Sequence, residues 1–140
     1  MNFETPCNQE VSTMTYIYKL TDKSGKTRAG YNNCLDWSVP GTQHEATGLV
    51  RELCTDGLLH GYVDPLLAVF MDPIHGRYLS SPGARMFKLK TNCELVREGQ
   101  LKCGVRSTTV VEEIPVPVVT TVQRVKFAIY CAAAAMRIEL

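Results

Sequence analysis

Hydrophobic and polar residues alternate near the start of the chain, which is the pattern of a β-strand with one buried face. In residues 14–20 the alternation places Tyr16 and Tyr18 on the same face. Turn-forming residues follow at 22–25, and we expect the chain to return as a second strand through 27–31. This part of the sequence therefore predicts a β-hairpin.

A second alternating segment covers residues 84–91. Its hydrophobic positions Phe87 and Leu89 should point inward, and the lysines that follow each of them should point outward. Another strand is expected after Gly99, whereas residues 32–62 carry turn signals and predict irregular structure with short strands. The N-terminal part is therefore expected to be rich in antiparallel sheet.

Two helices are expected, and both begin with capping signals. Asp64 followed by a proline predicts a short helix over 65–71, because aspartate caps the first turn and proline suits its first position. Thr120 and Gln123 match a capping box, which opens a C-terminal helix to about Met136. The apolar stripe of this second helix consists of Val122, Val125, Ile129 and Ala132 or Ala133.

The predicted fold class is α+β: an antiparallel, sheet-rich N-terminal part, a short middle helix, and a C-terminal helix packed on the sheet. A chain of 140 residues, 45% of them hydrophobic, can bury one core, and no linker divides it. We expect a single domain over 14–140. Residues 1–13 show no period and precede a second methionine, which predicts a flexible leader or an alternative start.

The charge balance and the apolar runs limit the kinds of partner. Fifteen basic residues against fourteen acidic ones leave a net charge of +1, which is too little to gather a nucleic-acid polymer. The longest apolar run, 127–136, is shorter than the ~20 residues that cross a bilayer. We therefore expect neither a nucleic-acid polymer nor a membrane as partner, and a small anion remains a candidate ligand.

Six cysteines are scattered singly along the chain, without a Cys-x-x-Cys pair. This spacing favours reduced, mostly buried thiols over a disulfide framework or a zinc site. Reduced thiols in turn indicate a cytosolic protein. The six are Cys7, Cys34, Cys54, Cys93, Cys103 and Cys131.

Catalytic and metal-binding motifs are missing from the sequence. There is no nucleophile elbow, P-loop or Gly-x-Gly-x-x-Gly, and His44, His60 and His75 lack the i, i+4 spacing of metal-binding helices. We expect no cofactor, no metal and no enzymatic activity, so that the protein captures a ligand and does not convert it. A catalytic site assembled from distant residues stays open as an alternative.

Two segments carry candidate ligand-binding residues. One loop combines an imidazole, a guanidinium and a phenol, and a second segment places three hydroxyl residues after an arginine. Arginine donors pair with phosphate, and flat aromatic or guanidinium faces stack on a base. The alternative in both cases is an ordinary surface loop, since Ser and Thr are common in turns. The candidate residues are Arg106, Ser107, Thr108, Tyr78, Arg77 and His75.

Three parts of the chain resemble the first-described family of phage Thoeris anti-defence proteins, over about Met14 to Ala135. The first is YIYKLTD, and the second combines LCTDGLLH, PLLAVF and PIH. The third runs from GVRS through IPVP to TTVQRVKFAIYC. Within this resemblance Arg106 and Ser107 match the family's binding arginine segment, and Tyr78 is the natural occupant of its stacking aromatic position.

The resemblance implies a nucleotide sponge in the host cytoplasm. Such proteins bind the cyclic ADP-ribose isomers that a TIR-domain sensor makes, and they hold them without degrading them. The host effector then receives no signal and does not deplete NAD. The resemblance also implies a β-rich N-terminal part with helical C-terminal packing, homo-oligomers built from dimers, and in some members a second site for cyclic oligonucleotides.

Two other functions stay open: an enzyme that cleaves a cyclic nucleotide signal, and a phage inhibitor that binds a protein. Recovery of intact ligand after incubation separates a sponge from an enzyme. For a sponge, we expect Arg106→Ala to weaken nucleotide binding while the melting temperature stays nearly unchanged.

Overall fold

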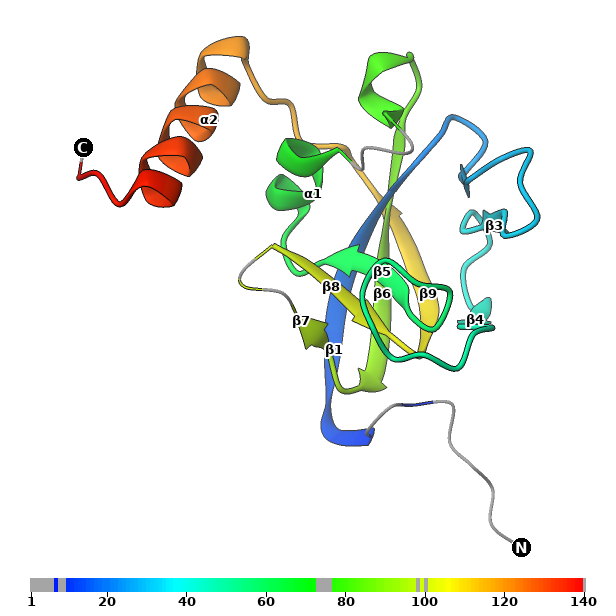
Figure 1. Ribbon diagram of the computed structural model, residues 1–140. Helices are drawn as coiled ribbons and strands as arrows, with labels where there is room; N and C mark the ends of the chain where they lie inside the picture. The colour runs from blue at the N-terminus through cyan, green and yellow to red at the C-terminus, as the bar shows by residue number, and fades with distance from the viewer. Residues whose placement is uncertain (1–6, 8–9, 73–76, 98, 100, 140) are drawn as a thin grey trace, which may run out of the picture.

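Seven antiparallel strands form the main sheet of the protein, as the computed structural model shows (Figure 1). Their order across the sheet is β4-β9-β6-β1-β5-β8-β7, and β2 and β3 form a separate two-stranded sheet. The structure describes residues 7, 10–72, 77–97, 99 and 101–139. The strands are β1 Glu10–Thr21, β2 Lys26–Thr27, β3 Leu35–Asp36, β4 Gln43–Glu45, β5 Leu59–Tyr62, β6 Arg85–Cys93, β7 Val96–Arg97, β8 Lys102–Val105 and β9 Ser107–Ile114. The helices are α1 Pro65–Met71, the 3-10 helix η1 Tyr78–Ser80 and α2 Thr121–Met136.

β1 runs through the middle of the main sheet. It pairs with β6 on one side and with β5 on the other. Both alternating segments of the sequence are therefore strands, as predicted, and Phe87 and Leu89 are buried. The short strands β3, β4 and β5 lie in the segment that was expected to be irregular.

The expected return strand over 27–31 is wrong. After Thr27 the backbone takes left-handed conformations at Arg28, with φ 53°, and at Gly30, with φ 86°. An extended strand does not contain such residues, so β2 ends at Thr27. β2 then pairs with β3 in the separate small sheet.

β9 was not predicted as a strand of its own. The strand expected over residues 100–107 is β8, which ends at Val105, and β9 begins at Ser107, where that expected strand ends. In β9 neighbouring residues are often of the same type, so polar and apolar positions do not alternate. Its pairing with β6 also shifts at a β-bulge, where Val111 has no partner between Val110 and Glu112. The bulge removes the period of two on which strand prediction depends.

The main sheet carries hydrophobic residues on both faces. On one face Trp37 and Val105 pack with Leu89, because the sheet curves and brings β5 and β8 across β6 (Figure 1). On the other face Val69 of α1 packs with Met86. The protein therefore has two separate hydrophobic clusters, one on each face of β1 and β6.

Both predicted helices and their caps are confirmed. The Asp64 side chain accepts a hydrogen bond from the Leu66 amide at 2.7 Å. At the start of α2, the Gln123 amide donates to Thr120 Oγ1, and the Gln123 side chain accepts from the Thr120 amide. These bonds satisfy amides that the first helical turn leaves without partners.

The α+β class is confirmed, with an antiparallel sheet, a short middle helix and a C-terminal helix. α2 meets α1 through Phe127, whose ring stacks on Phe70 with centroids 4.3 Å apart. Its apolar stripe is exposed, with Val122, Val125 and Ile129 at 63%, 52% and 50%. No helix in the described part of the chain is long and apolar enough to span a membrane.

A disulfide between Cys7 and Cys93 joins the N-terminal segment to the end of β6. This corrects the expectation that all six cysteines are reduced, and it removes the argument from reduced thiols for a cytosolic protein. β1 also begins at Glu10, so residues 10–13 of the expected leader belong to the first strand. Register explains the bond: Glu10 is paired with Cys93, which brings Cys7 beside it, and sequence spacing does not reveal such pairing. The free cysteines are Cys34, Cys54, Cys103 and Cys131.

Candidate functional site

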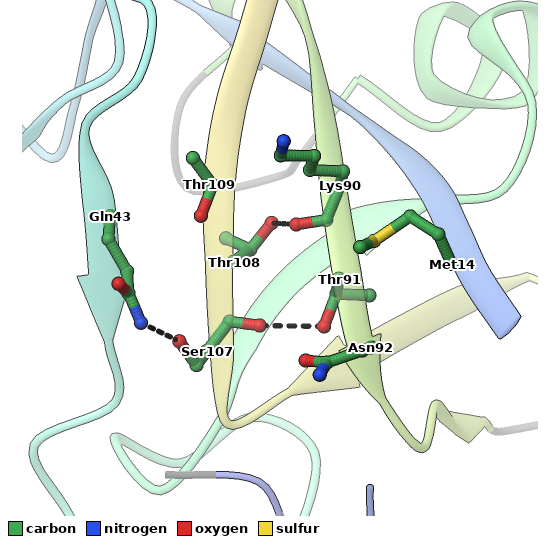
Figure 2. A pocket seen from close by; sticks show the side chains of 8 residues that line it. All are labelled: Met14, Gln43, Lys90, Thr91, Asn92, Ser107, Thr108 and Thr109. Carbon is green, nitrogen blue, oxygen red and sulfur yellow. Dashed lines mark hydrogen bonds between the residues drawn. The ribbon is translucent and has the colours of Figure 1, made fainter. Parts of the chain in front are cut away.

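A polar hollow of about 70 Å³ opens where β6 and β9 stop pairing through their backbones (Figure 2). The ladder between these strands ends at the Lys90–Thr109 pair. Beyond it, Thr91 Oγ1 donates to the Ser107 carbonyl at 2.7 Å, and Thr108 Oγ1 donates to the Lys90 carbonyl at 2.9 Å. These hydroxyl bridges hold the strands together beside the hollow. Its lining residues are Met14, Gln43, Lys90, Thr91, Asn92, Ser107, Thr108 and Thr109.

Two of the predicted ligand residues, Ser107 and Thr108, line this hollow, and both are buried. Gln43 Nε2 donates to Ser107 Oγ at 3.0 Å. The Ser107 hydroxyl proton and the Gln43 amide oxygen remain available to a ligand, because neither takes part in that bond. The hollow therefore presents both a donor and an acceptor.

An aromatic and cationic surface continues from the hollow along β1 and β6. Tyr16 is paired with Lys90 across the two strands, and its side chain is 44% exposed. Nζ of Lys88 lies 4.2 Å from the centroid of the Tyr16 ring. Met14, which is 50% exposed, joins this surface to the hollow. We call the surface formed by Met14, Tyr16, Lys88, Lys90 and the hollow the open face.

The two lysines of the open face have no carboxylate within ion-pair distance among the described residues. The ion pair found in that part of the chain joins Arg85 and Glu113 at 2.7 Å, near the start of β6. Glu112 is opposite Lys88 in the strand register but forms no such pair. Lys90, whose cross-strand partners Tyr16 and Thr109 carry no charge, therefore contributes positive charge to the open face, which favours an anionic ligand.

Arg106 lies outside the lining of the hollow. Its Nη1 donates to the carbonyl oxygens of Gly48 and Gly57, both at 2.6 Å. The loop is tightly packed there, since a Cβ added at Gly57 would meet the Val50 carbonyl oxygen at 1.5 Å. The structure therefore gives Arg106 a part in holding this loop, and contact of Arg106 with a ligand stays a prediction.

Arg77 and Tyr78 lie at the opposite end of the sheet. Tyr78 Oη accepts a hydrogen bond from the Arg28 amide at 3.3 Å, and burial raises the pKa of the Tyr78 phenol. Most of β6 lies between this end and the hollow, a separation of roughly 20 Å at the rise of a strand. The structure therefore does not bring the two predicted segments together within one chain. His75 lies outside the described residues.

Several residues with ligand-binding chemistry were missed by the sequence analysis. Beside Tyr78, the Arg28 guanidinium lies 5.1 Å from the centroid of the Tyr31 ring. On the open face, the alternation already predicted outward lysines at 88 and 90, but gave them no function. The sequence does not contain the strand register that sets Tyr16 beside Lys90.

The opposite face of β1 holds a second group of titratable residues. Nζ of Lys19 donates to the His60 carbonyl at 2.6 Å and lies 5.0 Å from the Trp37 ring centroid. Burial lowers the pKa of Lys19 to about 8. Burial, followed by the charges of Lys19 and Lys102, lowers the pKa of His60 to about 4. The neutral His60 Nε2 accepts from the Cys54 amide at 2.9 Å.

Neither a metal-binding group nor similarity to a known protein identifies the function of this site. Within the residues that the structure describes, there is no group of three or more His, Cys, Asp or Glu side chains that could hold a metal ion. No protein-family model, no curated protein and no solved structure matches the chain. The structural support for a function therefore comes from the chemistry of the open face.

Proposed function

We propose that the protein binds a cyclic ADP-ribose-type signalling nucleotide and sequesters it without degrading it. As a phage protein in the host cytoplasm, it blocks TIR-derived immune signalling by keeping the nucleotide from the host effector. The supporting observation is the open face, where the Tyr16 ring, two ammonium groups and several hydroxyls lie side by side. A base stacks on aromatic faces, and phosphate oxygens pair with cationic donors.

The composition of the hollow supports capture over conversion. Its eight lining residues include no histidine and no carboxylate. A general base has to lie within hydrogen-bond reach of the proton that it takes. The polar partner that Ser107 Oγ has there is the side-chain amide of Gln43, which is no base.

The size of the hollow supports self-association as part of the proposal. Sites that enclose a small molecule have volumes of about 300–1,000 Å³, far above the hollow's own. A nucleotide on one chain therefore extends across the open face, and slow release requires a cover. We infer that a second copy supplies this cover in a homo-oligomer built from dimers.

An exposed stripe on α2 supports such an oligomer. Its members are separated alternately by three and four residues, which is the spacing of a coiled-coil seam. At 3.6 residues per turn, Phe127 lies on the opposite side of the helix, toward α1, so the seam points away from the chain's own core. The seam residues are Val122, Val125, Ile129, Ala132 and Met136.

Calorimetry with cyclic ADP-ribose isomers tests the proposal. We expect binding, and we expect Lys90→Gln to weaken it by about tenfold, the effect of one charge-assisted hydrogen bond. Lys126→Gln, at an exposed position of α2, is the matched control and should bind like the parent.

The fate of the ligand separates the alternative functions. After incubation and heat denaturation, the supernatant should contain the unchanged cyclic nucleotide. Linear ADP-ribose there would identify an enzyme and reject sequestration. Absence of binding to every isomer would reject the nucleotide ligand and favour a protein-binding inhibitor.

A further inference from the structure

The hydrogen-bonding groups of the hollow include acceptors as well as donors. Gln43 and Asn92 carry amides, each of which has an oxygen acceptor and an NH₂ donor. Ser107 and Thr109 carry hydroxyls, which donate and accept. Lys90 adds the lining's one full positive charge.

This mixture suits sugar hydroxyls better than a phosphate group. A phosphate presents oxygen acceptors and is bound by clustered donors, usually arginine or lysine. The Gln43 amide oxygen, whose NH₂ group is held by Ser107 Oγ, would face those phosphate oxygens without a proton between them. A sugar hydroxyl both donates and accepts, so it satisfies each kind of group in the lining.

The volume of the hollow also favours a pair of sugar hydroxyls as the bound group. A volume of about 70 Å³ admits a few small polar groups, such as the two neighbouring hydroxyls of a ribose ring, but not a whole nucleotide. The carbon skeleton of the sugar can then lie against the exposed thioether side chain of Met14, which forms one wall (Figure 2).

We propose that the hollow is a ribose subsite, which takes the 2′,3′-diol of one ribose of the bound nucleotide. This inference rests on the proposed function and adds a specificity: the protein selects ribose over 2′-deoxyribose. Tyr16, paired with Lys90 at the rim, is then placed beside the sugar to stack on the attached base. Lys88 and Lys90 face the diphosphate.

Calorimetry with three probes tests the subsite: cyclic ADP-ribose and two analogues, each lacking the 2′-hydroxyl of one ribose. The parent protein should bind one analogue at least about tenfold more weakly than cyclic ADP-ribose, because a lost hydroxyl leaves lining groups unpaired. Thr109→Val keeps the side-chain shape and removes a lining hydroxyl, so it should reduce this discrimination. Thr121→Val, at an exposed position on α2, is the control and should leave it unchanged.

Ser107→Ala is a second variant, with the melting temperature as a folding check because Ser107 is buried. If Ser107→Ala unfolds, the test rests on Thr109→Val alone, because Thr109 is partly exposed and its replacement should leave the protein folded. Equal affinity of the parent for all three probes would overturn the ribose subsite and leave the proposed function standing. Pyrophosphate competition that disappears in Thr109→Val would instead make the hollow a phosphate site. Failure to bind any cyclic ADP-ribose isomer would overturn both proposals.

Discussion

Nη1 of Arg106 donates to the carbonyl oxygen of Gly57 at 2.6 Å, a contact that spans 49 residues of chain. The same nitrogen reaches Gly48, so one side chain joins both ends of the loop 48–57 to the β8–β9 junction. Hydrogen bonds of a charged donor to carbonyl groups contribute more to stability than neutral ones. Arg106 is therefore a structural anchor before any ligand is considered.

We expect Arg106→Ala to lower the free energy of unfolding by about 2 to 3 kcal/mol, because two carbonyl groups lose a charged donor. Urea unfolding followed by circular dichroism measures this change. Lys126→Ala, at an exposed position without such bonds, should stay within about 0.5 kcal/mol of the parent. Unchanged stability with lost nucleotide affinity would instead support the sequence-based expectation that Arg106 binds the ligand directly.

Local signals in the sequence predicted the parts of the fold that depend on a few neighbouring residues. Thr120 and Gln123 satisfy each other's amides within one turn, so their helix start was predictable. The left-handed backbone at Arg28 depends on context, and it ended a strand that the composition favoured. Local sequence therefore predicted caps better than strand ends.

The candidate site depends on long-range pairing, and for this reason it was predicted only in part. Ser107 and Thr108 were singled out by chemistry, and the structure places both in the hollow. Tyr16 was assigned to a strand, but its position beside Lys90 comes from the register of β1 and β6. A single sequence does not contain that register, and it likewise does not reveal that β6 separates Tyr78 from the hollow.

The Cys7–Cys93 disulfide closes a loop with a sequence separation of 86. The chain-entropy argument gives such a crosslink about 4.6 kcal/mol of stabilisation, mainly by restricting the unfolded chain. We expect a reducing agent, or Cys7→Ser, to lower the free energy of unfolding by an amount of this order. Cys131→Ser removes an exposed free thiol and is the control, with little expected effect.

Mass spectrometry of the alkylated, non-reduced protein provides the direct check on the disulfide. When the protein is unfolded without a reductant before alkylation, four alkylated cysteines are expected if the bond is present, in agreement with the free thiols of the structure. Alkylation of Cys7 and Cys93 under these conditions would show them as reduced thiols, as the sequence had suggested. A free energy of unfolding that does not change when a reducing agent is added would also indicate that these two cysteines are reduced.

Lowering the pH should destabilise the protein through His60. In the native state burial, and then Lys19 and Lys102, lower its pKa to about 4, whereas an unfolded histidine titrates near ~6.5. Between these values the unfolded chain binds a proton that the native protein does not. The free energy of unfolding therefore decreases as pH falls from about 6.5 to about 4.

His60→Gln isolates this effect, since glutamine does not titrate and its side-chain oxygen can still accept from the Cys54 amide. Urea unfolding of parent and variant at several pH values between about 7 and 4 gives two stability curves. The difference between the curves should shrink or change sign as pH falls, because the parent loses stability that the variant retains. Parallel curves would show that His60 titrates normally in the native protein.

The exposed seam of α2 makes self-association testable with one substitution. Ile129 lies in the middle of the seam and is 50% exposed in a single chain, so Ile129→Glu should leave the monomer folded. Between two paired helices the same glutamate would be buried without a partner, which strongly disfavours the pair. We therefore expect the parent to be a dimer or larger by light scattering at micromolar concentration, and the variant to be a monomer. Gln123→Glu adds the same charge outside the seam and keeps the capping box, so it should remain associated. A parent that stays monomeric throughout this range would remove α2 as the contact and leave the open face without its proposed cover.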